Sequence, residues 1–151
     1  MTVEGPRKIS TMAAARPTGG KLWARTVFRV SDVAQSIAYF CDKLGFDKDW
    51  DEGGPGSAIA QVSRSGVELI LDNKTYFPKA GVPSVISLTL NDLVERPALD
   101  ALHREFLAAG AKITKAPFKV HWDPNVFEMD VEDLDGNILM FWGYMPPQNE
   151  R

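Results

Sequence analysis

Several features that would point to a particular partner or compartment are missing from this sequence. It has a single cysteine, Cys41, so no disulfide can form within the chain, and we expect this thiol to be buried as a small hydrophobic side chain. No basic run is present and the formal net charge is -3, which argues against a nucleic-acid partner. No apolar run approaches the roughly 20 residues of a membrane span. These absences predict a cytoplasmic protein with neither a nucleic-acid nor a membrane partner.

The common signatures of catalysis and cofactor binding are also absent. There is no nucleophile triad, no CxxC pair and no dinucleotide-binding fingerprint. The glycine-rich segment 53–56 has neither the lysine nor the following helix that a phosphate-binding loop requires. We therefore expect no cofactor and assign no catalytic residue.

The clearest pattern that is present runs from Thr26 to Phe46. Its β-branched and aromatic start, Thr26–Val30, predicts a strand, and Asp32 can cap the helix that follows. Gly45 can adopt the left-handed conformation that ends a helix. Four apolar residues spaced three and four apart predict the buried stripe of this helix: Ile37, Phe40, Cys41 and Leu44.

This strand–helix unit occurs twice, and each copy is followed by three predicted strands. The second copy begins at Ser84–Leu90, with Asp92 before a helix from about Arg96 to Ala109. An Asp-Gly turn at Asp133–Asn137 joins its last two strands, and the final strand is Ile138–Trp142. One such module cannot bury both its helix and its sheet, whereas two can share a concave sheet.

The repeat predicts an α+β fold of two βαβββ modules that form a concave mixed-sheet cleft. The expected parts are a flexible N-terminal extension (1–22), a first module (23–75), a linker (76–83), a second module (84–145) and a C-terminal tail (146–151).

The order and spacing of these motifs resemble the vicinal oxygen chelate superfamily. The resemblance is carried by strand-Val-x-Asp-helix-Leu-Gly-Phe in the first half, and by Ala-Ala-Gly-Ala and Asp-x-Asp-Gly-Asn in the second. It covers Trp23 to Tyr144. That superfamily includes glyoxalase I, extradiol dioxygenases, fosfomycin-modifying enzymes and bleomycin resistance proteins, so the resemblance implies a fold more than an activity.

The resemblance also implies where a metal would be held. Enzymes of that superfamily place His, Gln or Glu ligands on the first, fourth, fifth and eighth strands. Carried over, these positions fall at Arg25 or Thr26, Glu68, Ser84 or Val85, and Met140. Only Glu68 keeps a ligand type, and Arg25 would repel a cation. We therefore expect no metal.

Among the branches, the metal-free bleomycin resistance proteins fit best. They bind planar cationic glycopeptides on aromatic residues in clefts between two subunits, which implies a homodimer and a role in antibiotic resistance. Leu44–Trp50 matches a segment of that family that ends in a cleft aromatic, and Trp122 falls near its cleft tryptophan. The chain departs from that family in its longer N-terminus, in a stretched spacing from Trp122 to Asp133, and in His121.

Four residues are predicted to line a ligand pocket: Trp50, Glu68, His121 and Trp122. Either tryptophan can stack on a flat ligand or cover the fold. Glu68 is a pocket charge or an outward surface residue. His121 is a candidate for a hydrogen bond or proton transfer, with a solvated loop histidine as the alternative. Trp142, on a continuous apolar strand, is expected in the core.

These observations favour a bleomycin-resistance-like protein that sequesters a small flat or cationic molecule without metal and without converting it. One alternative is a metal-dependent enzyme of the same superfamily, such as a lyase, isomerase or dioxygenase, whose ligands lie elsewhere in the chain. Another is a protein-interaction or regulatory module.

Overall fold

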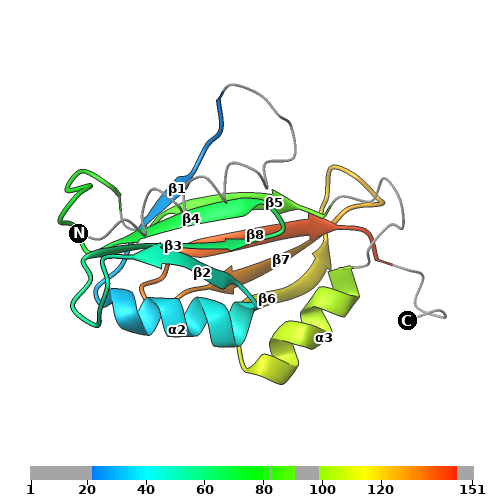
Figure 1. The fold of residues 1–151 in the computed structure, drawn as a ribbon. Coiled ribbons are helices and arrows are strands. Elements are labelled where there is room, and N and C mark those ends of the chain that lie inside the picture. The colour runs from blue at the N-terminus through cyan, green and yellow to red at the C-terminus, as the bar shows by residue number, and fades with distance from the viewer. Residues whose placement is uncertain (1–21, 82, 91–98, 146–151) are drawn as a thin grey trace. The chain divides into compact units, whose positions relative to one another are not determined.

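The computed structural model describes residues 22–81, 83–90 and 99–145 (Figure 1). The chain divides into two compact units, Met1–Ser84 and Val85–Arg151. In each, the order of described elements is strand, helix and three strands. The predicted α+β fold of two βαβββ modules is therefore confirmed. None of the helices described is both long and apolar enough to cross a membrane.

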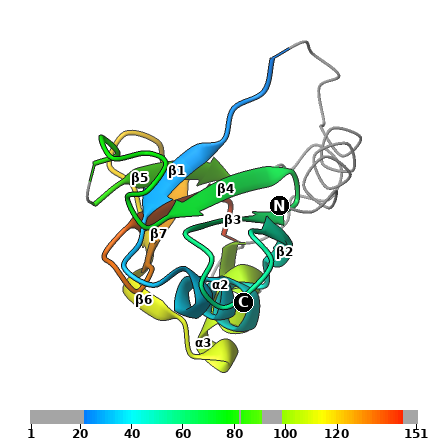
Figure 2. The same cartoon turned by 60° about the vertical axis from the view of Figure 1, so that its left-hand side comes forward.

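The first unit is a four-stranded sheet with one helix against it (Figures 1 and 2). Its elements are β1 (Thr26–Arg29), α2 (Val33–Leu44), β2 (Asp47–Asp51), β3 (Ile59–Arg64) and β4 (Val67–Asp72). The strand order is β1-β4-β3-β2. β1 runs parallel to β4, and β3 and β4 form an antiparallel hairpin. The parallel pairing follows from the helical crossover between β1 and β2.

The ends of α2 are those that the sequence predicts. The Gln35 backbone N–H donates to Asp32 Oδ1 over 3.0 Å. Gly45 has φ 71°, and the next N–H, of Phe46, donates to the Phe40 carbonyl over 3.0 Å. This pattern satisfies carbonyls that the last helical turn leaves free, and glycine adopts its left-handed conformation without steric cost.

The buried stripe of α2 is rotated from the predicted one. The buried residues are Val33, Ser36, Tyr39, Phe40 and Leu44. Ile37 and Cys41 are half-buried at the margin of the stripe, whereas Tyr39, which packs edge-on against Phe40, is buried. Burial, with the nearby charge of Asp42, raises the pKa of the Cys41 thiol and keeps it protonated.

Replacing Asp32 by alanine is expected to lower the free energy of unfolding by about 1 kcal/mol, because the Gln35 N–H loses its acceptor. Urea unfolding measures the change. Asp42→Ala, an exposed position inside the same helix, is the matched control and is expected to leave stability within about 0.5 kcal/mol. Equal losses in the two variants would contradict the capping role.

The second unit has the same topology. Its elements are β5 (Val85–Thr89), α3 (Leu99–Ala109), β6 (Lys112–Lys119), β7 (Phe127–Glu132) and β8 (Ile138–Gly143). The strand order is β5-β8-β7-β6, with β5 parallel to β8. The predicted cap Asp92 and the predicted first turn of its helix lie outside the described residues. Phe106 of α3 packs against Phe141 of β8 with 5.4 Å between ring centroids, which places the core between helix and sheet.

The strand β6 is longer than the sequence predicts. From the sequence, 111–114 is expected to be a short strand and the segment through Pro117 a loop, whereas β6 continues to Lys119. Two irregularities, on either side of Lys115, interrupt its pairing with β7. β6 is the edge strand, where proline's missing N–H breaks no ladder inside the sheet, so Pro117 is tolerated.

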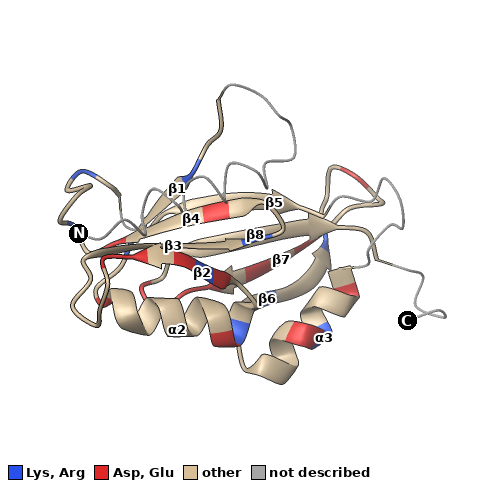
Figure 3. Ribbon diagram, in the orientation of Figure 1, with Lys and Arg blue, Asp and Glu red and all other residues tan. Residues whose placement is uncertain are grey.

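Each sheet has one apolar face against its helix and a second face that carries polar side chains. Because side chains alternate along a strand, cross-strand partners share a face. We call the second face of the first sheet, with Asp49, Gln61, Ser63 and Glu68, the first polar face. The second polar face carries Glu128, Asp130 and Glu132 of β7, Lys112 and Lys115 of β6, and Trp142 of β8. Acidic residues along β7 are visible in Figure 3.

Candidate functional site

The first polar face is organised around the amide of Gln61, which is completely buried. Its Nε2 donates to Glu68 Oε2 over 2.9 Å and to Asp49 Oδ2 over 3.1 Å. Arg25 Nη1 donates to Gln61 Oε1 over 3.2 Å. Glu68, only 9% exposed, is thus a buried carboxylate that the amide satisfies, and not an outward surface residue.

Trp50 lies on the same face of the first unit. It pairs with Gln61 across an irregularity in β2 between Lys48 and Trp50. Its indole Nε1 is buried and has no hydrogen-bond acceptor among the described residues. A buried indole N–H without a partner is uncommon, so Trp50 offers a donor as well as a ring.

The residue types at the superfamily's metal positions do not fit a divalent metal. The guanidinium of Arg25 donates to Gln61, and Gln61 in turn donates to Glu68. A positive charge is therefore present near Glu68. Ser84 Oγ donates to the Gly81 carbonyl over 3.2 Å, and Met140 offers only a thioether, a soft ligand. No group of three or more His, Cys, Asp or Glu in the described ranges could hold a metal ion.

The loop after β4 is held by the buried carboxylate of Asp72. It accepts from the backbone N–H groups of Lys74, Tyr76 and Phe77 at 2.9, 3.2 and 3.1 Å. The Tyr76 hydroxyl donates to Glu52, which raises the pKa of Tyr76 and lowers that of Glu52. Tyr76 and Phe77 remain exposed and line, with Val27, an apolar cavity of about 460 Å³.

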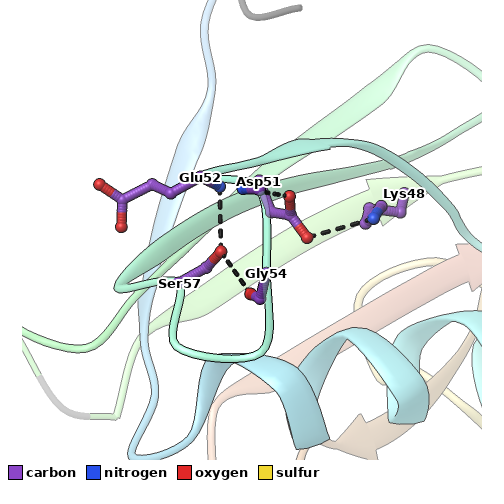
Figure 4. A network of polar contacts seen from close by, with 6 residues as sticks. Lys48, Asp51, Glu52, Gly54 and Ser57 are labelled. Atoms are coloured by element: carbon purple, nitrogen blue, oxygen red, sulfur yellow. Dashed lines mark hydrogen bonds and ion pairs between the residues drawn. The ribbon is translucent and has the colours of Figure 1, made fainter. Parts of the chain in front are cut away.

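A second cavity of the first unit, about 500 Å³, lies between α2 and the β2–β3 loop. Figure 4 shows how that loop is tied together. Lys48 Nζ lies 3.1 Å from Asp51 Oδ2, and Ser57 Oγ accepts from the Glu52 N–H and donates to the Gly54 carbonyl at 3.0 and 2.8 Å. These contacts stabilise the loop, and we assign this cavity no ligand.

The second polar face contains a pair of carboxyl groups. Glu128 and Asp130 are each 8% exposed, and they lie two residues apart on the same face of β7. Trp142 Nε1 donates to Glu128 Oε1 over 2.9 Å, while Lys115 Nζ lies 3.8 Å from Asp130 Oδ2. Burial and then the contact with Glu128 raise the pKa of Asp130 to about 6, and Lys115 offsets this only in part.

An aromatic pair borders these carboxyl groups. The rings of Trp122 and Trp142 are 5.2 Å apart between centroids and tilted by 53°. Trp122 is 53% exposed, Trp142 is half-buried, and His121 beside them is exposed. The expectation that Trp142 belongs to the core is wrong, because it pairs with Glu128 while Leu139 and Phe141 are the β8 residues buried in the core.

The four predicted pocket residues therefore fall into two groups. Trp50 and Glu68 belong to the first unit, and His121 and Trp122 to the second. The pair formed by Glu128 and Asp130 is not among the predicted pocket residues, although the sequence contains a signal for it. Phe127, Met129 and Val131 alternate toward the core, so the acids between them must share the other face.

Comparison with known protein families and solved structures identifies relatives of this chain. Residues 23–141 match the family model of the glyoxalase/bleomycin resistance protein/dioxygenase superfamily. The chain belongs to this superfamily. The resemblance inferred from the sequence motifs is thus confirmed at superfamily level. No curated protein matches the chain.

Solved structures share the fold of this chain at low sequence identity. TioX from Micromonospora sp. ML1 is 15% identical, with 82% of this chain and 99% of that chain covered and a TM-score of 0.66. A superfamily member from Sphaerobacter thermophilus is 21% identical, with coverages of 82% and 98% and a TM-score of 0.62. A lactoylglutathione lyase from Agrobacterium tumefaciens is 14% identical, with coverages of 82% and 93% and a TM-score of 0.60.

Proposed function

We propose that this superfamily member sequesters a small, flat, cationic molecule at its second polar face, without metal and without chemical conversion, in the manner of the bleomycin-resistance branch. The observation that carries the proposal is the contact between Trp142 Nε1 and Glu128 Oε1. It joins an aromatic pair to a pair of carboxyl groups within one unit.

The two parts of this face favour the same ligand chemistry. An exposed indole attracts a flat cation through its apolar area and through the negative face of its ring. Carboxyl groups that are largely out of water form strong, charge-assisted hydrogen bonds with a cation. Because Trp122 is half-exposed, it offers the ligand a surface, and Glu128 and Asp130 supply the charge.

The alternative of a metal-dependent lyase, isomerase or dioxygenase has weaker support. Such an enzyme needs several nitrogen or oxygen donors around one ion. At the positions where enzymes of the superfamily hold metal ligands, this chain has Glu68, next to the Arg25–Gln61 hydrogen bond, and the thioether of Met140. The donor chemistry therefore favours binding over metal-assisted conversion.

N-methylquinolinium, a flat two-ring cation, is expected to bind, and Trp122→Ala is expected to weaken its binding roughly tenfold by removing the exposed ring. Isothermal titration calorimetry at pH 7 measures both affinities. Trp23→Ala, which removes an exposed tryptophan of the first unit, is the matched control and should bind as the unaltered protein does. No heat of binding, or equal affinities for the two variants, would contradict the proposal.

A further inference from the structure

The carboxyl pair on β7, Glu128 and Asp130, lacks a hydrogen-bond donor, within the part of the chain that the structure describes, for one of its buried oxygens. Glu128 and Asp130 are two residues apart on one strand and face the same side of the sheet. Ionising both would place two negative charges side by side with little water to screen them, so the pair holds a proton at a higher pH than an exposed carboxyl group does. Asp130 Oδ1 is buried and has no donor among the described residues. A buried acceptor of this kind requires a donor from elsewhere.

Few charges in the described part of the second unit can supply that donor. From β6, Lys115 Nζ approaches Asp130 Oδ2 only to 3.8 Å, and its side chain is 63% exposed. Lys112, on the same strand, is paired with Glu132 over 3.1 Å.

Among the other described elements of the second unit, β8 and α3 carry no charge toward the pair, and the loop between β6 and β7 carries His121 and Asp123. The β8 residues that share the face are Ile138, Met140 and Trp142, none of which titrates near neutral pH. The helix α3 packs on the opposite face, where Phe106 meets Phe141. The pair is therefore a site of excess negative charge with an unmet need for an N–H or O–H group.

We propose that a ligand cation carrying at least two N–H donors, of the amidinium or guanidinium type, bridges Glu128 and Asp130 and exchanges with the proton that the pair binds in acid. Binding forms N–H···O hydrogen bonds to both carboxylates, and where the pair is protonated it releases that proton to solvent, with no covalent bond made or broken. This inference rests on the proposed function and specifies the ligand class and its regulation by pH.

The exchange has two measurable consequences. First, a cation with N–H donors binds more tightly than a cation of similar shape without them, because a charge-assisted hydrogen bond contributes more than charge alone. Second, binding weakens in acid, because a larger fraction of the pairs then carries a proton that the cation must displace. With a pKa of about 6 for Asp130, the affinity at pH 5 is expected to be about tenfold lower than at pH 7.

The test compares three two-ring probes by calorimetry: naphthalene-2-carboxamidine, N-methylquinolinium and the neutral naphthalene-2-carboxamide. Titrations at pH 5 and pH 8, each in two buffers of different ionisation enthalpy, give the number of protons released. We expect the amidine to release close to one proton at pH 5 and almost none at pH 8. Its affinity at pH 7 should exceed that of N-methylquinolinium about tenfold.

Two variants isolate the pair. Asp130→Asn is expected to abolish both proton release and the pH dependence, and to weaken amidine binding about tenfold. Glu132→Gln makes the same change of charge two residues along the strand, where Lys112 is the partner, and should leave proton release intact.

The outcomes separate this inference from the proposed function. If both cations bind but the amidine releases no proton at pH 5, the exchange is wrong and the cation-binding function stands. If neither cation binds, or if the neutral carboxamide binds equally well, both are wrong. Proton release that persists in Asp130→Asn would also overturn the exchange.

Discussion

Asp133→Ala is expected to lower the free energy of unfolding by about 3 kcal/mol. Asp133 is 1% exposed, and its Oδ1 accepts from the backbone N–H groups of Asp135 and Asn137 at 2.9 and 2.8 Å. Its Oδ2 accepts from Asn137 Nδ2 at 2.9 Å. Alanine leaves three donors without this acceptor, in a turn whose buried groups water reaches poorly, and each unsatisfied group costs roughly 1 kcal/mol or more.

Urea unfolding at pH 7 measures this loss. The matched control is Asp123→Ala, which removes a similar contact, from the Asn125 N–H to Asp123 Oδ1 at 2.8 Å, in an exposed loop. There water replaces the lost acceptor, so the expected loss is below about 1 kcal/mol. Similar losses in both variants would show that burial of the turn is not what makes Asp133 important.

The sequence predicts those parts of the fold that depend on neighbouring residues. The cap at Asp32, the glycine that ends α2 and the Asp133–Asn137 turn are each governed by groups within five positions of one another. All three are found as predicted. The repeat of these local signals sufficed to predict two βαβββ modules.

The faces of the strands are harder to predict when apolar residues occupy both sides. In β7 the alternation of Phe127, Met129 and Val131 marks the core face without ambiguity. In β8 nearly every residue is apolar, so the two-residue period is hidden and Trp142 resembles a core residue. Only the pairing with β7 places it beside Glu128.

Contacts between distant residues lie beyond sequence reasoning altogether. Gln61 joins Asp49 and Glu68 from two different neighbouring strands, and the first contact depends on an irregularity within β2. No local pattern specifies such a register. The family resemblance identifies Glu68 as a candidate pocket residue, but the sequence does not show that the amide of Gln61 donates a hydrogen bond to its carboxylate.

Asp130→Asn is expected to raise the free energy of unfolding by about 2 kcal/mol at pH 7, although it removes a charge from the proposed site. The pKa of Asp130 is about 6 in the folded protein and 3.8 in an unperturbed state. Because the folded state binds the proton more tightly, stability falls as the pH rises through this interval. At 1.36 kcal/mol per pKa unit, ionising Asp130 costs the folded state about 3 kcal/mol.

Asparagine avoids that cost because it stays neutral and removes the repulsion between the two carboxylates. We expect about 2 kcal/mol of gain, less than the full cost, because the substitution also removes the ion pair of Asp130 with Lys115. Thermal unfolding should show an increase in Tm of roughly 4 to 8 °C at pH 7 and little change at pH 4, where Asp130 is largely protonated. Glu132→Gln, which removes an exposed ion pair, should change stability by less than about 1 kcal/mol.

Together with the loss of amidine binding, this gain would show that Asp130 is maintained at the expense of stability. A residue that serves only the fold would lower stability when it is replaced, as Asp133 should. One that binds a cation destabilises the free protein, because its charge is buried without an adequate partner until the ligand arrives. If Asp130→Asn proves less stable at pH 7, the carboxyl pair has a structural partner, and its assignment as a cation site fails.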